Sequence, residues 1–152
     1  MDCAAIPIGE LLPHGPAMTV IDRLVEYDAK RSVATVTIER TSRFFVATGV
    51  PAWVGIEYMA QTIAAHAGYE ARQRGEPPAI GFLLGTRAYR NELPEFPLRS
   101  KLTITVEPLI AEGGFGAFQC AIATDHAVAT AVVNTYQPAA HELAQFRLKA
   151  PS

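Results

Sequence analysis

Glu57 and Gln61 are the residues whose chemistry stands out, because they share a long and otherwise largely apolar segment. At about 100° of rotation per helical residue, Gln61 lies about 40° from Glu57, so the two side chains share one face. Ala64 and Gly68 lie about 20° from Glu57, which leaves room for a substrate chain or a second helix. A carboxyl group among apolar neighbours can act as a general acid. The structural alternative is an acid that interacts with the helix dipole.

Four histidines and two cysteines offer other chemistry, but their settings favour structural roles. His66 follows Glu57 by nine residues, about 180° around the helix, so we expect a core or interface histidine that shares no site with Glu57. Two cysteines are too few for a zinc site, and we expect no metal. We expect His14 to have a structural role in a turn and His126 to lie on the surface in a hairpin turn. His141 is expected on the surface in the tail, and Cys120 in the core.

One long helix and six strands are predicted to position these groups. The helix covers about residues 53–74, without proline, and Gly75 follows as a stop signal. Alternating or apolar runs predict strands at residues 18–27, 32–39, 79–90, 101–107, 114–124 and 127–137. A tail of about 139–152 follows, with a short helix expected at 140–148. This order predicts one α+β domain over residues 1–152, a curved antiparallel sheet around a central helix, which is the hotdog fold.

The composition narrows the classes of partner. The 152 residues are 49% hydrophobic and 18% charged, with a net charge of −2. Such a chain is expected to bury apolar surface in a dimer and to bind no nucleic acid. We see no membrane span and no signal peptide, so a cytoplasmic location is expected.

Three segments carry a resemblance to a known family. Residues 11–24 read LLPHGPAMTVIDRL and resemble the opening of the 3-hydroxyacyl-[acyl carrier protein] dehydratases, which have Leu-Leu-Pro-His-Arg, then an apolar pair and Asp-Arg. Residues 51–61 read PAWVGIEYMAQ and resemble the start of the family's central helix, where an acid precedes Gln by four positions. Residues 97–104 match more weakly. The similarity runs from about Ile8 to Pro138 and is closest to the dehydratase-like proteins of aryl-polyene pigment clusters.

One departure from that family pattern concerns the catalytic histidine. The family places it in Gly-His-Phe-Pro-Gly, fourteen positions before the helix acid, and this position is Arg43 here, followed by a matching Phe44. Arginine stays protonated and cannot be the base, but it can bind the phosphate of a phosphopantetheine group. The alternative is a solvated loop arginine. The backbone amides of Val54 and Gly55, at the helix start, are candidates to bind the thioester oxygen.

The resemblance implies a 3-hydroxyacyl-[acyl carrier protein] dehydratase with Glu57 and Gln61 at the catalytic site. The substrate would be an acyl thioester carried on the phosphopantetheine of a carrier protein, with no further cofactor. Since the family builds its sites between two subunits, we expect either a homodimer or a heterodimer with a related hotdog subunit, and in the heterodimer the partner would supply the missing histidine. One alternative is a non-catalytic hotdog subunit or carrier-binding module. Another is an acyl thioesterase in which Glu57 directs water.

Overall fold

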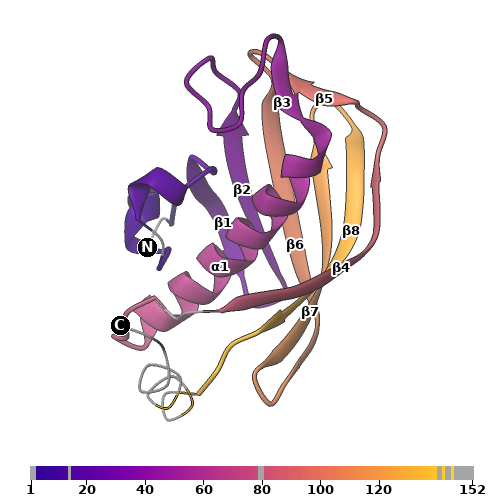
Figure 1. Ribbon diagram of the computed structural model, residues 1–152. Helices are drawn as coiled ribbons and strands as arrows, with labels where there is room; N and C mark the ends of the chain where they lie inside the picture. Colours follow the sequence, from indigo (N-terminus) through magenta and orange to yellow (C-terminus); the bar gives the residue numbers. More distant parts are fainter. Residues whose placement is uncertain (1–2, 14, 79–80, 140–141, 143–144, 146–152) are drawn as a thin grey trace.

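A six-stranded antiparallel sheet wraps around a single long helix (Figure 1). The computed structural model describes residues 3–13, 15–78, 81–139, 142 and 145. The strands follow the order β1-β2-β6-β7-β8-β4, and the helix is α1 (Gly55–Gln73). The sheet comprises β1 (Arg23–Asp28), β2 (Arg31–Thr37), β4 (Phe82–Asn91), β6 (Lys101–Glu112), β7 (Phe115–Ala123) and β8 (Ala127–Tyr136). The predicted α+β architecture is therefore confirmed.

The central helix is buried on most sides, as its apolar composition predicts. Tyr58 and Met59 are among its fully buried side chains and join the core formed with the concave face of the sheet. The predicted start at Trp53 is two residues early, because Ala52–Val54 form a 3-10 turn, η4, before α1 begins. Trp53 is 59% exposed, so this turn leaves the largest side chain of the segment outside the core.

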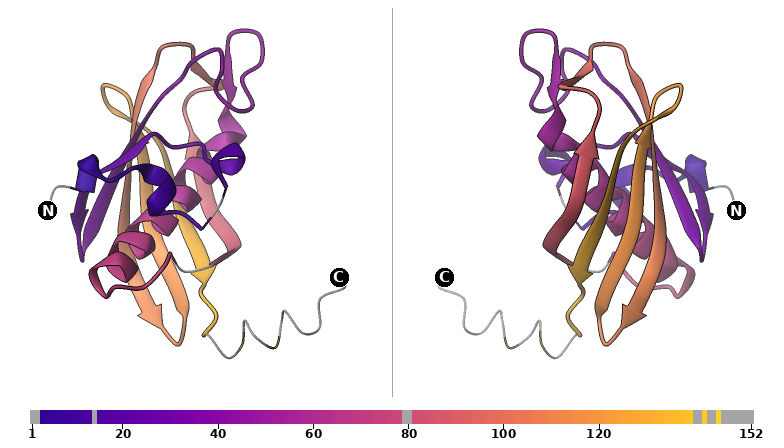
Figure 2. Two further views of the ribbon diagram at one scale, coloured as in Figure 1. Left: turned by 90° about the vertical axis from the view of Figure 1, so that its left-hand side faces the viewer. Right: turned by 90° about the vertical axis from the view of Figure 1, so that its right-hand side faces the viewer.

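The N-terminal segment covers the side of α1 that faces away from the sheet (Figure 2). It contains three short 3-10 helices, η1 (Cys3–Ala5), η2 (Ile8–Glu10) and η3 (Pro16–Met18). The carbonyl of Leu11 lies so close to α1 that a Cβ atom at Gly68 would fall 1.8 Å from its oxygen. The room expected at Gly68 for a substrate or a second helix is thus filled by the chain's own backbone.

The strand predicted at residues 18–27 begins only at Arg23 in the structure, five residues after its predicted start. The polar backbone groups of Met18 and Val20 bond to the side chain of Gln61 instead of to a neighbouring strand. These residues therefore form an extended link that lies against α1. The apolar character of Val20 and Ile21 reflects packing against the core, which periodicity alone does not distinguish from a strand.

A two-stranded sheet of β3 (Gly49–Pro51) and β5 (Glu95–Pro97) was not predicted from the sequence. Each strand has three residues, too few for a visible alternation. The pair leads directly into η4, where the amide of Ala52 donates to the carbonyl of Pro94 at 3.3 Å. This small sheet fixes the point at which the central helix starts. The predicted tail helix falls mostly outside the described residues.

Candidate functional site

Glu57 lies in the first turn of α1 and is half-buried. Its Oε1 accepts a hydrogen bond from Nε2 of Gln61 at 2.9 Å, the contact expected for residues four apart on a helix. Within the described part of the chain, no second hydrogen bond or ion pair to the Glu57 carboxylate is present. One oxygen is thus held while the other remains free for a ligand.

Gln61 is 1% exposed and has a partner on each side of its amide group. Its Nε2 donates to the carbonyl of Met18 at 2.7 Å, in addition to Glu57, and its Oε1 accepts from the amide of Val20 at 2.8 Å. These bonds fix the orientation of the side-chain amide, because reversing it would set donors against donors. Gln61 therefore orients Glu57 and ties the helix to the link that precedes β1.

Tyr89 braces the start of the helix, a role that no pattern in the sequence indicates. Its hydroxyl donates to the carbonyl of Ala52 at 2.5 Å and accepts from Nδ2 of Asn91 at 3.0 Å. A Cβ atom on Gly55 would fall 2.2 Å from that hydroxyl, so a side chain there would displace the hydroxyl from the Ala52 carbonyl. The amide of Gly55 already donates to the carbonyl of Ala52, and Val54 is fully buried. The proposed role of both amides toward a thioester oxygen stays a prediction.

Arg43 and Phe44 form an exposed corner beside the link that Gln61 holds. Nη1 of Arg43 donates to the carbonyl of Ala17, and the guanidinium lies 5.2 Å from the centre of the Phe44 ring. Phe44 adopts a φ of 68° and packs edge-on against Trp53, with ring centres 5.2 Å apart. The unusual backbone conformation turns this aromatic side chain back toward the helix start.

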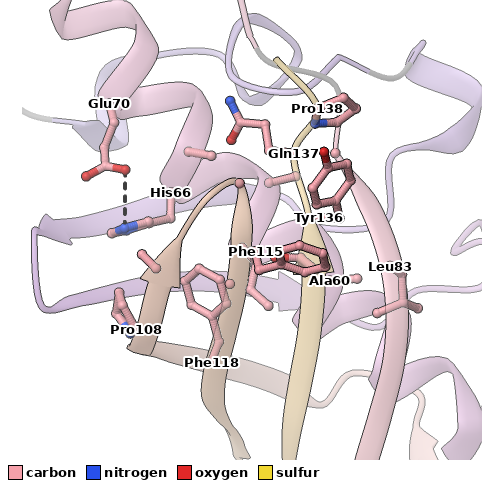
Figure 3. Close-up of a pocket in the computed structure, with 18 of the residues that line it drawn as sticks. Ala60, His66, Glu70, Leu83, Pro108, Phe115, Phe118, Tyr136, Gln137 and Pro138 are labelled. Carbon is pink, nitrogen blue, oxygen red and sulfur yellow. Dashed lines mark ion pairs between the residues drawn. The ribbon is translucent and has the colours of Figure 1, made fainter. Parts of the chain in front are cut away.

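A cavity of about 720 Å³ runs along α1 beside the tips of β6, β7 and β8 (Figure 3). Glu57 and Gln61 both line this cavity. The helix lines it with small side chains, and the sheet contributes aromatic ones such as Phe115 and Phe118. None of the four residues predicted to bind substrate is part of its lining: Arg43, Phe44, Val54 and Gly55. The structure therefore groups the two predicted catalytic residues and leaves the other four around the helix start.

His66 lines the same cavity, although the sequence predicts it on the opposite side of the helix from Glu57. Nine residues of helix separate the two by about 14 Å along the axis, so they do not touch. His66 is 3% exposed, and its Nδ1 lies 2.6 Å from the hydroxyl oxygen of Ser32. Its Nε2 lies 3.6 Å from Oε1 of Glu70, and Oε2 of Glu70 accepts from the Tyr27 hydroxyl at 2.8 Å.

This environment predicts a pH-dependent stability. Burial lowers the pKa of His66 from its usual value near 6.5, and the Glu70 carboxylate partly opposes this shift. Because the unfolded chain then binds the proton more readily, the free energy of unfolding falls below about pH 6.5, by up to about 1.4 kcal/mol per pH unit, until the folded-state pKa is reached. Thermal melts between about pH 7.5 and 5 measure this. A His66→Gln variant should lose stability less steeply, and identical slopes would contradict the assignment.

The remaining candidates have structural settings. His126 is exposed and lies 3.7 Å from Glu92, which confirms a surface position. Cys120 is fully buried in β7, and burial raises the pKa of its thiol to about 12, so it stays protonated as a core residue. His14 and His141 lie outside the described residues.

No group of His, Cys, Asp and Glu side chains suited to a metal ion occurs among the described residues. Within that same part, no helix has the length and hydropathy needed to cross a membrane.

Comparison with known proteins identifies the family. The sequence matches the ApeP-like family, described as ApeP dehydratase, over residues 6–147. Among curated proteins, none matches the chain significantly. One chain of the dehydratase heterocomplex ApeI:P from Xenorhabdus doucetiae is 31% identical, with a TM-score of 0.85, and the match covers 95% of this chain and 99% of that one.

More distant structures share the fold alone. A hypothetical thioesterase from Streptococcus pneumoniae, solved with coenzyme A, is 12% identical with a TM-score of 0.59, over 76% of this chain and 84% of that one. The PaaI protein of Escherichia coli is 12% identical with a TM-score of 0.58, over 76% and 78%. The resemblance seen in the opening segment and the helix start is confirmed, since the family match spans nearly the whole sequence. This chain is a hotdog-fold protein that belongs to the ApeP-like dehydratase family.

Proposed function

We propose that Glu57 acts in the dehydration of 3-hydroxyacyl thioesters, at a site completed by a second hotdog subunit. The observation that carries this proposal is the Glu57 carboxylate, held at one oxygen by Gln61 and open to a cavity at the other. The family assignment supports the reaction class. The similar structure from Xenorhabdus doucetiae is a heterocomplex, which supports a second subunit for this chain.

The reaction needs a base that acts at the carbon next to the thioester carbonyl and an acid that acts at the hydroxyl oxygen on the following carbon. A base takes the proton next to the thioester carbonyl, a double bond forms to the next carbon, and the bond from that carbon to its hydroxyl oxygen breaks. Glu57 gives its proton to the leaving oxygen, which departs as water. Among the described residues, no histidine reaches Glu57, because His66 lies about 14 Å along the helix. The proposed partner subunit supplies the base, and histidine suits that task at neutral pH.

Arg43 suits a substrate that arrives on a carrier protein. Its guanidinium is exposed and, in the described part of the chain, forms no ion pair, so it is available to a phosphate. We expect Arg43→Ala to raise KM about tenfold for a 3-hydroxyacyl phosphopantetheine thioester while kcat changes little. The thioester of pantetheine, which lacks the phosphate, should show no such rise. Arg31→Ala, at an exposed arginine paired with Glu26, is the matched control.

The decisive experiment follows the mass of the acyl group on a 3-hydroxyacyl carrier thioester. The protein is assayed alone and as the complex isolated from its host cells. Loss of one water with the complex but not with the isolated chain supports a site shared between subunits. Loss of one water with the isolated chain requires a base within this chain. The same loss from a complex that carries Glu57→Gln would identify a non-catalytic hotdog subunit. Release of the free acid would identify a thioesterase.

A further inference from the structure

The end of the cavity farthest from Glu57 is polar, although its middle is apolar. Ala60, Ala64 and Ala67 form one small-residue stripe of α1 along the cavity, opposite Phe115 and Phe118. His66 and Glu70 line the cavity closer to the C-terminal end of α1 than Ala60 does, as Figure 3 shows. Glu70 follows Glu57 by thirteen residues, about 20 Å along the helix. A chain that starts at Glu57 and follows the apolar stripe therefore ends at a polar pair.

This polar pair has unused hydrogen-bonding capacity that faces the cavity. The His66 side chain is 4% exposed, and its Nδ1 is engaged with Ser32. Its Nε2 lies 3.6 Å from Oε1 of Glu70, which is too long for a hydrogen bond. The other oxygen of Glu70 is held by the hydroxyl of Tyr27. One nitrogen of a buried imidazole and one carboxylate oxygen are thus fixed in place without bonding each other.

The charge of the cavity restricts what can occupy this end. Among the described residues that line it are four glutamates and no lysine or arginine: Glu57, Glu70, Glu112 and Glu142. Burial lowers the pKa of His66, so at neutral pH the imidazole is uncharged and does not balance the Glu70 carboxylate. A ligand that ends in a carboxylate would meet the like charge of Glu70, whose side chain is 38% exposed, so a partly screened repulsion opposes its binding. A ligand that ends in a neutral donor meets an acceptor.

We propose that His66 and Glu70 form a subsite for the far end of the acyl chain, which selects chains ending in a hydroxyl group and rejects chains ending in a carboxylate. With Nδ1 accepting from Ser32, Nε2 carries the proton and donates to the hydroxyl oxygen. The hydroxyl in turn donates to Oε1 of Glu70, so the ligand oxygen lies beside the two atoms, which are 3.6 Å apart, and bonds to both. This inference rests on the proposed function, which places the thioester beside Glu57.

The test compares three pantetheine thioesters of one long chain length, whose far ends are a methyl, a hydroxyl and a carboxylate group. Calorimetric titration of the isolated complex measures their Kd values. Two hydrogen bonds, one to a buried imidazole and one to a half-buried carboxylate, predict that the hydroxyl compound binds about tenfold more tightly than the methyl compound. The carboxylate compound should bind most weakly. Equal affinities for the hydroxyl and methyl compounds, or no binding of any of the three, would overturn the proposal.

Two variants separate recognition from a loss of folding. Glu70→Gln keeps the size of the side chain and removes the charge, so the hydroxyl preference should fall severalfold while the carboxylate compound binds more tightly. A gain in affinity cannot arise from unfolding. Glu107→Gln makes the same chemical change at an exposed position of β6 outside the cavity lining, and should alter none of the three Kd values. A carboxylate affinity unchanged by Glu70→Gln would contradict the electrostatic part of the proposal.

The subsite and the proposed reaction can fail separately. A short 3-hydroxyacyl thioester does not reach His66, so its dehydration by the complex reports on Glu57 alone. Selection of the hydroxyl compound without dehydration would leave the subsite standing and remove the proposed function. Dehydration of the short thioester without hydroxyl selection would do the reverse.

Discussion

Replacement of Glu57 by glutamine is expected to lower kcat for dehydration by about a hundredfold to ten-thousandfold, the range by which a positioned acid accelerates such a reaction. The substitution is nearly isosteric, and the new side chain can still offer its carbonyl oxygen to Nε2 of Gln61. The local hydrogen bonding therefore survives. What disappears is the proton that the leaving hydroxyl needs to depart as water.

The measurement is the rate at which the acyl group of a 3-hydroxyacyl carrier thioester loses one water, with the complex carrying the variant chain. The melting temperature should stay close to that of the unmodified protein, because Glu57 is only half-buried and its single hydrogen bond is retained. Glu107→Gln is the control for removing one negative charge from the exposed surface. Normal turnover by Glu57→Gln would show that this carboxylate is not part of the site.

Substitution of Gly68 by alanine is expected to give the largest loss of stability among single methyl additions to the helix. The new Cβ atom would lie 1.8 Å from the carbonyl oxygen and 2.8 Å from the carbonyl carbon of Leu11. Both are backbone atoms, so no side-chain rotation can make room. Leu11 and Leu12 are buried in the core, and moving the segment that carries them would disturb their packing.

Overpacking of this kind costs about 1–3 kcal/mol, and the better helix propensity of alanine recovers up to about 1 kcal/mol. With a clash against fixed backbone, we expect a net loss near 2 kcal/mol, or about 4–8 °C in Tm for a domain of this size. Thermal or urea unfolding measures it. Gly9→Ala is the matched control, since no atom lies within 4 Å of its added Cβ. A Gly68→Ala protein as stable as the control would mean that the N-terminal segment does not pack on α1 as described.

The fold could be predicted from the sequence where a pattern is local and long. Lys101, Thr103 and Thr105 alternate with Leu102 and Ile104, and this period of two indicates a strand with one buried face. The apolar helix without proline is likewise a local property of its own residues. The six strands and the helix appear in the predicted order, with shifted boundaries. The short pair β3 and β5 escaped prediction because three residues carry no period.

The contacts of the candidate site also fall into two classes, those that local spacing predicts and those that it does not. The contact between Glu57 and Gln61 follows from helical spacing, because residues four apart meet on one face. The bonds from Gln61 to Met18 and Val20 join positions 43 and 41 residues apart, and no spacing rule predicts them. Tyr89 beneath Gly55 and Leu11 against Gly68 are contacts of the same long-range kind.

The central helix, its acid and amide on one face and the resemblance to the dehydratases could all be predicted, because they depend on residue type and local spacing. Long-range packing was needed to show which oxygen of Glu57 is held, what fills the space at Gly68 and which groups share the cavity. It placed His66 on that cavity, although the helical angle alone predicts the opposite side from Glu57. The physical reason is that a cavity belongs to several elements, and its lining is fixed only when the sheet curves around the helix.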